Sequence, residues 1–367
     1  MLILTDFHHH ALAESLLLLF EDRAGGSVYF PIGMEWFDEG VWNFERQAHG
    51  DAVARQYLVG IWADAVDIGD GIWRRHDPRH PGRIQHGITL EAARAEKWDL
   101  VISSLPHNDA GLHALAKQTG AKFGVQVGNN HQESAWHLAD FILSSSTLPQ
   151  AGLVSPDTWG RVKSFQGKPT IVYHQEFSLD SFMYLYPPAS KRFESFVNCF
   201  PEGPSYPDFL NFARRHPQFE FRVNGAYGRP SWYVSKEGEA YRDEFAGSDI
   251  MTVPDVARAM QDARAIWHTK HWSDGFGHVI HNAFAVGRPV IGYARYYKDK
   301  LAGPLWVEGK TSFDIEGMGE HELEGLLFLL RDDDEYHARI STEAAMRFRE
   351  IVNFDTEADA ILDLVAR

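Results

Sequence analysis

The sequence predicts an α/β protein built from two Rossmann-like domains with parallel sheets, and three observations support this prediction. Short apolar runs alternate with segments of helical spacing along most of the chain, as in parallel sheets covered by helices. The length of 367 residues fits two domains of roughly 100–200 residues each. The alternating pattern also occurs twice, before and after a linker-like stretch at 160–169.

In the first half, a strand at Leu2–Thr5 leads into a helix over His9–Arg23, which ends at the glycine pair Gly25-Gly26. The other elements expected here are strands at Val28–Phe30, Leu100–Ser103, Phe123–Val127 and Phe141–Leu143, and helices at Leu90–Lys97 and Ala110–Thr119. Because ligands bind beside the carboxyl ends of parallel strands, the polar loops that follow these strands are candidate site loops.

The second half repeats this plan and ends in a long helical segment from Glu320 to Arg367. Its other expected elements are strands at Ile171–His174, Ser195–Phe200, Phe219–Val223, Ala265–His268 and Pro289–Gly292, and helices at Pro207–Arg215, Val256–Asp262 and His278–Val286. We therefore expect an N-terminal domain at 1–165, a C-terminal domain at 170–345 and a C-terminal helix at 346–367.

The charge, the apolar runs and the cysteine content indicate which partners the protein does not bind and in which compartment it lies. Lys and Arg total 35 against 51 Asp and Glu, and the resulting net charge of −16 disfavours non-specific binding to nucleic acids or anionic membranes. No apolar run reaches the ~18 residues of a membrane span, and we expect no signal peptide. Cys199 is the single cysteine, which precludes an intrachain disulfide and favours a reducing compartment. We therefore expect a cytoplasmic protein.

The most informative segment runs from Asp274 to Ile291 and predicts a glycine turn, a helix and a strand. Its sequence is Asp-Gly-Phe-Gly-His-Val-Ile-His-Asn-Ala-Phe-Ala-Val-Gly-Arg-Pro-Val-Ile. Gly275 and Gly277 allow the backbone to approach a ligand closely, and the N–H groups at a helix start suit a phosphate or another anion. Asp274 and Asn282 lie eight residues apart, about two helical turns, so both side chains can reach one side of a ligand.

This segment resembles the donor-binding motif of retaining GT-B glycosyltransferases, the family that includes sucrose-synthase-like and mannosyltransferase-like enzymes. The family pattern is Glu-Gly-Phe-Gly, four residues, Glu-Ala and then Gly-x-Pro-Val-Ile, and here Asp274 and Asn282 occupy its two Glu positions. The resemblance implies a GT-B fold, in which two Rossmann-like domains face each other across a cleft. It also implies that the donor substrate is a nucleotide-diphosphate sugar, which we expect to be UDP-linked.

The resemblance further implies roles for residues of this segment. Asp274 would contact the donor sugar, and Asn282 would bind the ribose, since an asparagine can still hydrogen-bond hydroxyl groups without a charge. The backbone amides that would face the diphosphate belong to the turn residues Gly275, Phe276, Gly277 and His278. Because amides and cationic side chains neutralise the diphosphate in this family, we expect neither a metal nor a cofactor beyond the donor.

A cation beside the diphosphate is also implied by the resemblance. Family members usually carry an Arg and a Lys after the first strand of the second domain, whereas the corresponding stretch here, 198–204, contains neither. Lys270, just before the motif, and Arg229, after the strand that ends near Asn224, are the candidate replacements.

Three histidines in loops that follow strands of the first half are candidate catalytic residues. They are His8, His107 and His131. GT-B enzymes often place a histidine near the donor sugar, where it can contact the sugar or act as a general base. The sequence does not choose among the three, and an ordinary loop or helix-start role stays open for each. Glu176, where the family crosses into the second domain, is also expected near the cleft.

One basic segment of the first half is a candidate acceptor site. It contains Arg74, Arg75, Arg79 and Arg83, with Trp62 and Trp73 close in sequence. Arginine can hold phosphates and tryptophan can stack on a sugar or a base, so the segment suits an anionic acceptor. A modified base in DNA is one possibility, as in phage DNA glucosyltransferases. The alternative is a solvated loop whose arginines pair with the abundant acids.

The leading hypothesis is therefore a hexosyltransferase-like glycosyltransferase that moves a sugar from a UDP-sugar to an unidentified acceptor with retention. Three alternatives stay open: transfer to a modified base in DNA, a non-catalytic nucleotide-sugar or glycan-binding protein, and another enzyme of this architecture such as a sugar-nucleotide epimerase. In GT-B proteins the last helix commonly packs back on the first domain. The apolar stripe expected to do so here comprises Phe354, Ala358, Ile361, Leu362 and Val365.

Overall fold

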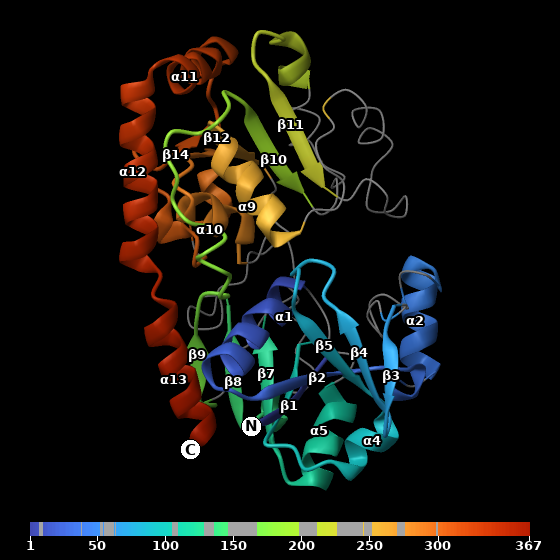
Figure 1. Cartoon of the computed structure of the whole chain (residues 1–367). Coiled ribbons are helices and arrows are strands. Elements are labelled where there is room, and N and C mark those ends of the chain that lie inside the picture. Colours follow the sequence, from blue (N-terminus) through green and yellow to red (C-terminus); the bar gives the residue numbers. More distant parts are fainter. Residues whose placement is uncertain are drawn as a thin grey trace. The chain divides into compact units, whose positions relative to one another are not determined.

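The structure is a computed structural model of the whole chain (Figure 1). It describes residues 1–6, 10–37, 39–51, 54, 62, 64–104, 109–127, 136–145, 167–197, 211–225, 245, 252–269, 276–298 and 300–367. The chain divides into two compact units. The first unit comprises Met1–Phe177 together with Phe354–Arg367, and the second comprises Ser178–Asn353.

The first unit contains a nine-stranded sheet with the order β3-β4-β5-β2-β1-β6-β7-β8-β9. Neighbouring strands are parallel except in the pairs β3-β4 and β4-β5, which form an antiparallel extension at one edge. The strands are β1 Leu2–Thr5, β2 Ser27–Pro31, β3 Val66–Gly69, β4 Ile72–His76, β5 Ile84–Ile88, β6 Leu100–Ser103, β7 Lys122–Val127, β8 Phe141–Ser144 and β9 Thr170–Val172.

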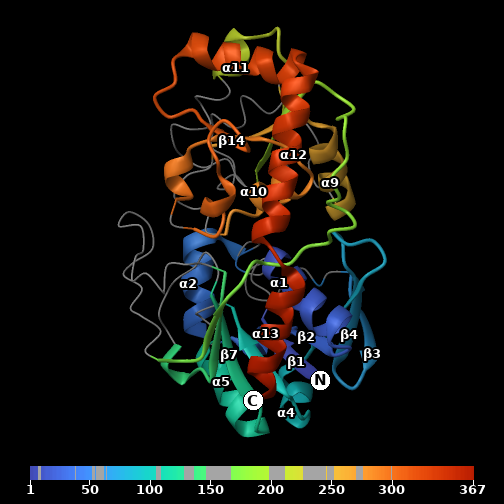
Figure 2. The ribbon, with the colours of Figure 1, turned by 90° about the vertical axis from the view of Figure 1, so that its left-hand side faces the viewer.

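Helices cover both faces of this sheet, which is why its central strands are apolar in consecutive positions. The helices of this unit are α1 His10–Leu17, the π-helix Leu18–Arg23, α2 Glu39–His49, α4 Leu90–Ala95, α5 Asp109–Thr119 and α13 Phe354–Ala366, with short 3₁₀ turns at Met34–Trp36 and Trp136–Leu138. Side chains alternate along a strand, so Ile3 packs with α1 and α13 while Leu4 packs with α4 and α5. Figure 2 shows α13 and α1 on the same side of the sheet.

Helix α13 joins the first unit although it is the last segment of the chain. Phe354, Ala358, Ile361 and Val365 are buried in the same core cluster as β1, β6 and β8 or beside it. Its apolar stripe therefore completes a core that the first 177 residues leave open. The Lys122 ammonium also donates to the carbonyl of Val365 at 2.8 Å, close to the end of the helix.

Polar contacts fix the beginning of α13 where the chain re-enters the first unit. The Arg23 guanidinium donates to Glu176 and to Asp355, each at 2.7 Å. These hydrogen bonds, to Glu176 above all, raise the pKa of Arg23. Both carboxylate oxygens of Glu357 are also engaged, one by the His174 backbone amide at 2.8 Å and one by His174 Nδ1 at 2.6 Å. The chain thus leaves and re-enters the unit at one clamped point.

The second unit contains an all-parallel sheet with the order β11-β10-β12-β13-β14. The strands are β10 Phe193–Val197, β11 Phe221–Gly225, β12 Ala265–His268, β13 Val290–Gly292 and β14 Ser312–Asp314. The helices are α9 Val253–Asp262, α10 His278–Ala285, α11 Glu320–Asp332 and α12 Asp334–Ile351, with 3₁₀ turns at Ala294–Tyr296 and Gly303–Leu305. The core on the α11 side of this sheet is rich in aromatic residues, including Phe193, Phe212 and Trp267.

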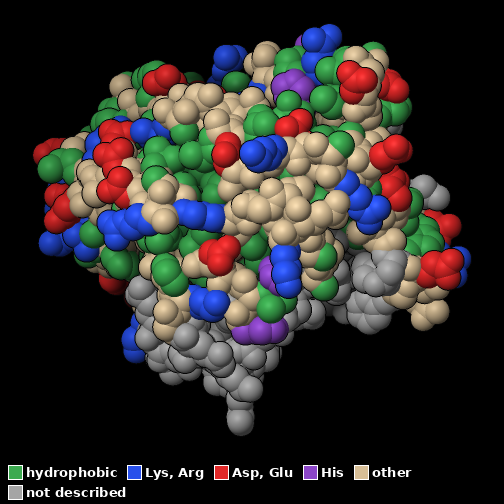
Figure 3. Space-filling view, turned by 90° about the horizontal axis from the view of Figure 1, so that it is seen from below, with side chains coloured by type: hydrophobic (Ala, Val, Ile, Leu, Met, Phe, Trp, Pro, Cys, Tyr) green, Lys and Arg blue, Asp and Glu red, His purple; other side chains and the backbone are tan. Residues whose placement is uncertain are grey.

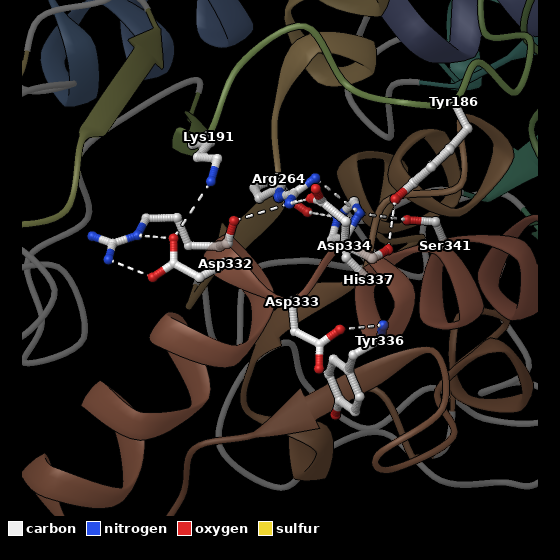
Figure 4. A network of polar contacts seen from close by, with 10 residues as sticks. Tyr186, Lys191, Arg264, Asp332, Asp333, Asp334, Tyr336, His337 and Ser341 are labelled. Carbon is white, nitrogen blue, oxygen red and sulfur yellow. Dashed lines mark hydrogen bonds and ion pairs between the residues drawn. The ribbon is translucent and has the colours of Figure 1, made fainter.

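A polar network centred on the buried side chains of Arg264 and His337 ties the start of β12 to the junction of α11 and α12 (Figure 4). The Arg264 guanidinium pairs with the Asp334 carboxylate and donates to the carbonyl of Arg331 at 2.9 Å. His337 Nε2 lies 2.6 Å from the Arg264 carbonyl, and since a carbonyl only accepts, Nε2 carries the proton. The Tyr186 ring stacks on His337 at 5.7 Å. Lys191, Asp332, Asp333, Tyr336 and Ser341 extend this network.

Acid should destabilise the protein through His337. Burial, with Arg264 and Arg288 nearby, lowers the pKa of His337 to about 4, from 6.5. Between these pH values the unfolded chain binds a proton at this imidazole that the folded protein binds poorly. The contribution of His337 to the free energy of unfolding should therefore be fully present above pH 6.5. It should fall by up to about 3 kcal/mol as the pH approaches 4.

Urea denaturation at several pH values between 7.5 and 4.5 measures this effect. His337→Gln should flatten the dependence of unfolding free energy on pH, whereas His321→Gln, at an exposed position, should keep the wild-type slope. A wild-type slope in His337→Gln would contradict the assignment.

Removal of α13 should unfold the first unit rather than merely shorten the chain. A chain ending at Asn353 loses several buried apolar side chains, each worth about 1.5–3 kcal/mol. Hydrogen exchange should then show lost protection in β1, β6 and β8. Deletion of Arg367 alone, an exposed residue, is the matched control. Unchanged protection in the truncated chain would show that α13 is dispensable for this core.

Candidate functional site

The strand order of the second sheet indicates where a ligand binds. From β10 the chain adds β11 on one side and then β12, β13 and β14 on the other side, so the strand order reverses between β10 and β12. Open parallel sheets bind ligands at such a switch point, outside the carboxyl ends of the strands. His268 ends β12 at this position and is buried. The chain leads from there to α10, whose N-terminus is the described part of the candidate site.

Gly277 forms the turn at which α10 begins. Its φ of +79° and ψ of 49° are left-handed, a conformation that glycine adopts without steric cost. A Cβ here would also lie 3.2 Å from Cβ of Ala302, so both the backbone conformation and this tight contact favour glycine. The Gly277 carbonyl accepts the amides of Ile280 and His281. The amides before them, in the first turn of a helix, have no acceptor within the helix and suit an anion.

Aromatic rings hold this turn in place. The Phe276 ring stacks on the His281 ring with 4.0 Å between centroids and 10° between planes, and the His278 ring lies edge-on to Phe276 at 5.4 Å. The Tyr297 ring packs close to Gly277 and stacks on Trp306 at 5.8 Å. The turn therefore has little freedom before any ligand arrives.

Asn282 is a polar side chain of α10 that a ligand can reach. The residue is partly exposed, whereas its Oδ1 atom is buried and finds no hydrogen-bond partner among the residues that the structure describes. A buried amide oxygen without a partner costs about 1–3 kcal/mol. A hydroxyl donor from a ligand would remove that cost.

The structure describes four of the residues expected at the donor site, and it brings Phe276, Gly277, His278 and Asn282 together at the start of α10. The remaining expected residues lie outside the described part of the chain: His8, His107, His131, Arg229, Lys270, Asp274 and Gly275. Glu176 is engaged by Arg23, as described above.

Sequence reasoning missed two residues, one at the carboxyl end of a strand and one within α10. Asp6 follows β1 and is buried; its Oδ1 accepts from the Ser104 amide at 2.7 Å and the Ser104 hydroxyl at 2.6 Å. This contact fixes the chain just before residues 7–9 and 105–108, which include His8 and His107. His281 is the second, and nothing in the motif spacing reserves that position. The signal for Asp6 was a carboxylate directly after an apolar strand.

The four arginines of the basic segment do not share one environment. Arg75 is buried, donates to Gln85 Oε1 at 2.8 Å and lies over the Trp62 ring at 4.5 Å. Arg83 pairs with Asp22 at 2.5 Å, so it is neutralised locally. Arg74, on the opposite face of β4, is exposed, and Arg79 is partly exposed. Figure 3 shows basic and acidic side chains intermixed on the face that it presents.

Among the described residues, no helix has both the length and the apolar character that a membrane span requires. In the same part of the chain, no three His, Cys, Asp or Glu side chains are grouped so that they could hold a metal ion.

Comparison with known proteins identifies the fold. No protein-family model matches the sequence, and no curated protein matches it. Solved structures match along the whole chain. HepE from Anabaena, in complex with UDP and glucose, is 13% identical with a TM-score of 0.61, covering 100% of this chain and 99% of HepE.

Two other similar structures are named as enzymes that act on sugars. Sucrose-phosphate synthase from Thermosynechococcus elongatus is 14% identical with a TM-score of 0.65, covering 99% of this chain and 98% of that one. The pneumococcal O-GlcNAc transferase GtfA, in complex with UDP and GlcNAc, is 9% identical with a TM-score of 0.61, covering 100% and 98%. The chain therefore has the GT-B fold of two Rossmann-like units, which confirms the fold class predicted from the sequence.

Charge reversal should affect protein stability much more at the buried Arg75 than at the exposed Arg74. Arg75→Glu places a carboxylate in a buried site and should destabilise the protein by about 3–5 kcal/mol. Arg74→Glu, one residue away on the same strand, should change stability by less than about 0.5 kcal/mol. Urea denaturation of both variants measures the difference. Equal effects would contradict the opposite orientations of the two side chains on β4.

Proposed function

We propose that this protein transfers a glycosyl group from a nucleotide-diphosphate sugar, UDP-linked, to an acceptor. The observation that carries the proposal is that one short helix has both the Gly277 turn at its start and the buried amide oxygen of Asn282. The helix start offers amides and a positive dipole end to a diphosphate. The buried oxygen offers an acceptor to a ribose hydroxyl.

The similar structures support this proposal through their ligands. HepE and GtfA are both described in complex with UDP, and HepE also in complex with UDP-glucose. Each shares the GT-B fold over nearly its entire length. The Gly277 turn suits a diphosphate, and the UDP ligands of these similar structures support a UDP-sugar as the donor.

In the proposed reaction the bond between the sugar C1 and the β-phosphate oxygen breaks, and an acceptor oxygen bonds to C1 and loses its proton. Charge develops on the leaving diphosphate, and preorganised amides at the α10 N-terminus stabilise it. Lys270 or Arg229 would supply a nearby cation, and Asp274 would contact the sugar. His8, His107 or His131 would contact the sugar or receive the proton. We propose that the sugar keeps its anomeric configuration.

Incubation with UDP-glucose and related UDP-sugars tests the activity. Release of UDP together with sugar transfer or slow hydrolysis supports a transferase, and NMR of the product gives the anomeric configuration. Binding without any release would instead support a nucleotide-sugar-binding protein, and a changed sugar without UDP release would support an epimerase. Failure of UDP and UDP-sugars to bind would overturn the proposal.

Asn282→Ala should weaken UDP binding without unfolding the protein. The loss of hydrogen bonds to ribose hydroxyls, worth roughly 0.5–1.5 kcal/mol each, corresponds to about two- to tenfold in Kd. Asn282→Glu, which restores the residue of the family motif, should bind at least as tightly as the wild type because a carboxylate accepts stronger hydrogen bonds. Calorimetry with UDP measures both, and Asn211→Ala, at an exposed position, is the control. Wild-type affinity in Asn282→Ala would show that this side chain does not bind the nucleotide.

A further inference from the structure

His281 connects the middle of α10 back to the turn at which the helix begins. The residue is fully buried. Its Nδ1 atom lies 2.9 Å from the carbonyl oxygen of Gly277, and its ring is stacked on Phe276. One side chain therefore contacts both the backbone and the aromatic side chain of the turn.

The contact with Gly277 determines which nitrogen of His281 carries a proton. A carbonyl oxygen only accepts hydrogen bonds, so Nδ1 of His281 must be the donor. The same oxygen also accepts the backbone amides of Ile280 at 3.0 Å and His281 at 3.1 Å. Three donors thus converge on the Gly277 carbonyl and fix its direction.

Fixing this carbonyl also fixes the amide that follows it. The Gly277 carbonyl and the His278 N–H belong to one planar trans peptide unit, in which they point in opposite directions. With the carbonyl held along the helix by His281, the His278 N–H is aimed outward from the helix start. That is the direction from which an anion approaches a helix N-terminus.

The ring stack restrains the other side of the same turn. Glycine has more backbone freedom than any other residue, so Gly277 alone would leave the peptide unit free to rotate. The Phe276 ring, held against the face of His281, limits that rotation. An aliphatic side chain at position 281 would provide neither the donor nor the parallel ring.

We propose that His281 is a positioning residue that aims the His278 amide at the diphosphate of the bound nucleotide. The inference rests on the proposed function, because it assigns the anion at the α10 N-terminus to the donor diphosphate. His281 acts through the peptide unit and does not itself touch the ligand. Its contribution should therefore appear with ligands that carry a diphosphate and vanish with ligands that lack one.

The test compares the affinities of the protein for UDP and for uridine, measured by calorimetry and NMR titration. His281→Phe keeps an aromatic ring against Phe276 and removes the donor to Gly277. It should weaken UDP binding about two- to tenfold and leave uridine binding unchanged. His281→Asn, whose amide nitrogen can replace Nδ1 as a donor, should recover most of the lost UDP affinity.

Phe284→Leu is the matched control, because Phe284 is fully buried in the same helix. It should lower the thermal stability while leaving the ratio of UDP to uridine affinity at the wild-type value. If His281→Phe does not fold, His281→Leu replaces it as the variant without a donor.

Two results would overturn the inference: a wild-type affinity ratio in the donor-free variant, or an equal loss of UDP and uridine binding. The second result would indicate a structural role only. Failure of the proposed function appears differently, because the wild-type protein itself would then bind neither UDP nor uridine.

Discussion

The guanidinium of Arg23 joins the two points at which the chain leaves and re-enters the first unit. It bonds Glu176, one residue before the end of the first segment of that unit, and Asp355, the second residue of α13. Charge-assisted bonds to two carboxylates are the stronger kind of hydrogen bond. Beside them the Phe177 and Phe354 rings meet edge-to-face at 5.3 Å. The core of the first unit is therefore completed by α13, the C-terminal segment of the chain. This core remains incomplete until the second unit has been traversed, and such non-local closure slows folding.

Much of the fold follows from the sequence, and the departures have physical causes. The apolar runs Leu2–Thr5, Leu100–Ser103 and Ala265–His268 are strands as expected, because strands buried on both faces are apolar in successive positions. The hairpin β3-β4 was missed because β3 has only four residues, all of them exposed, and the alternation of Val66 and Ile68 with polar residues is too short to mark a strand. The first segment of the first unit continues to Phe177, past the linker-like stretch at 160–169, because β9 pairs with β8. Composition marks a possible turn but cannot reveal such pairing.

The sequence predicted those parts of the candidate site that depend on backbone conformation, and it did not predict the orientations of side chains. A left-handed φ and the nearness of Ala302 favour glycine at position 277, and the motif spacing identified this residue. The proposed role of His281 depends on a ring stack and on the direction of one carbonyl, which are properties of tertiary packing. The environment of Arg75 depends in the same way on which face of β4 it occupies. A sequence pattern identifies residue types suited to a site, while packing decides their orientation.

The net charge of −16 places a particular demand on the proposed site for an anionic nucleotide. At long range such a protein repels a diphosphate, so binding has to rely on positive potential that acts at short range. The start of α10 provides this through aligned peptide dipoles, which amount to about half a charge at the helix end and act within its first turn. A dipole gains its full effect only when the N–H group points at the phosphate oxygen. In an acidic chain, the orientation of the peptide unit between Gly277 and His278 therefore matters more than it would beside a surplus of lysines. The proposed positioning role of the buried His281 side chain would meet that demand by fixing this one peptide unit.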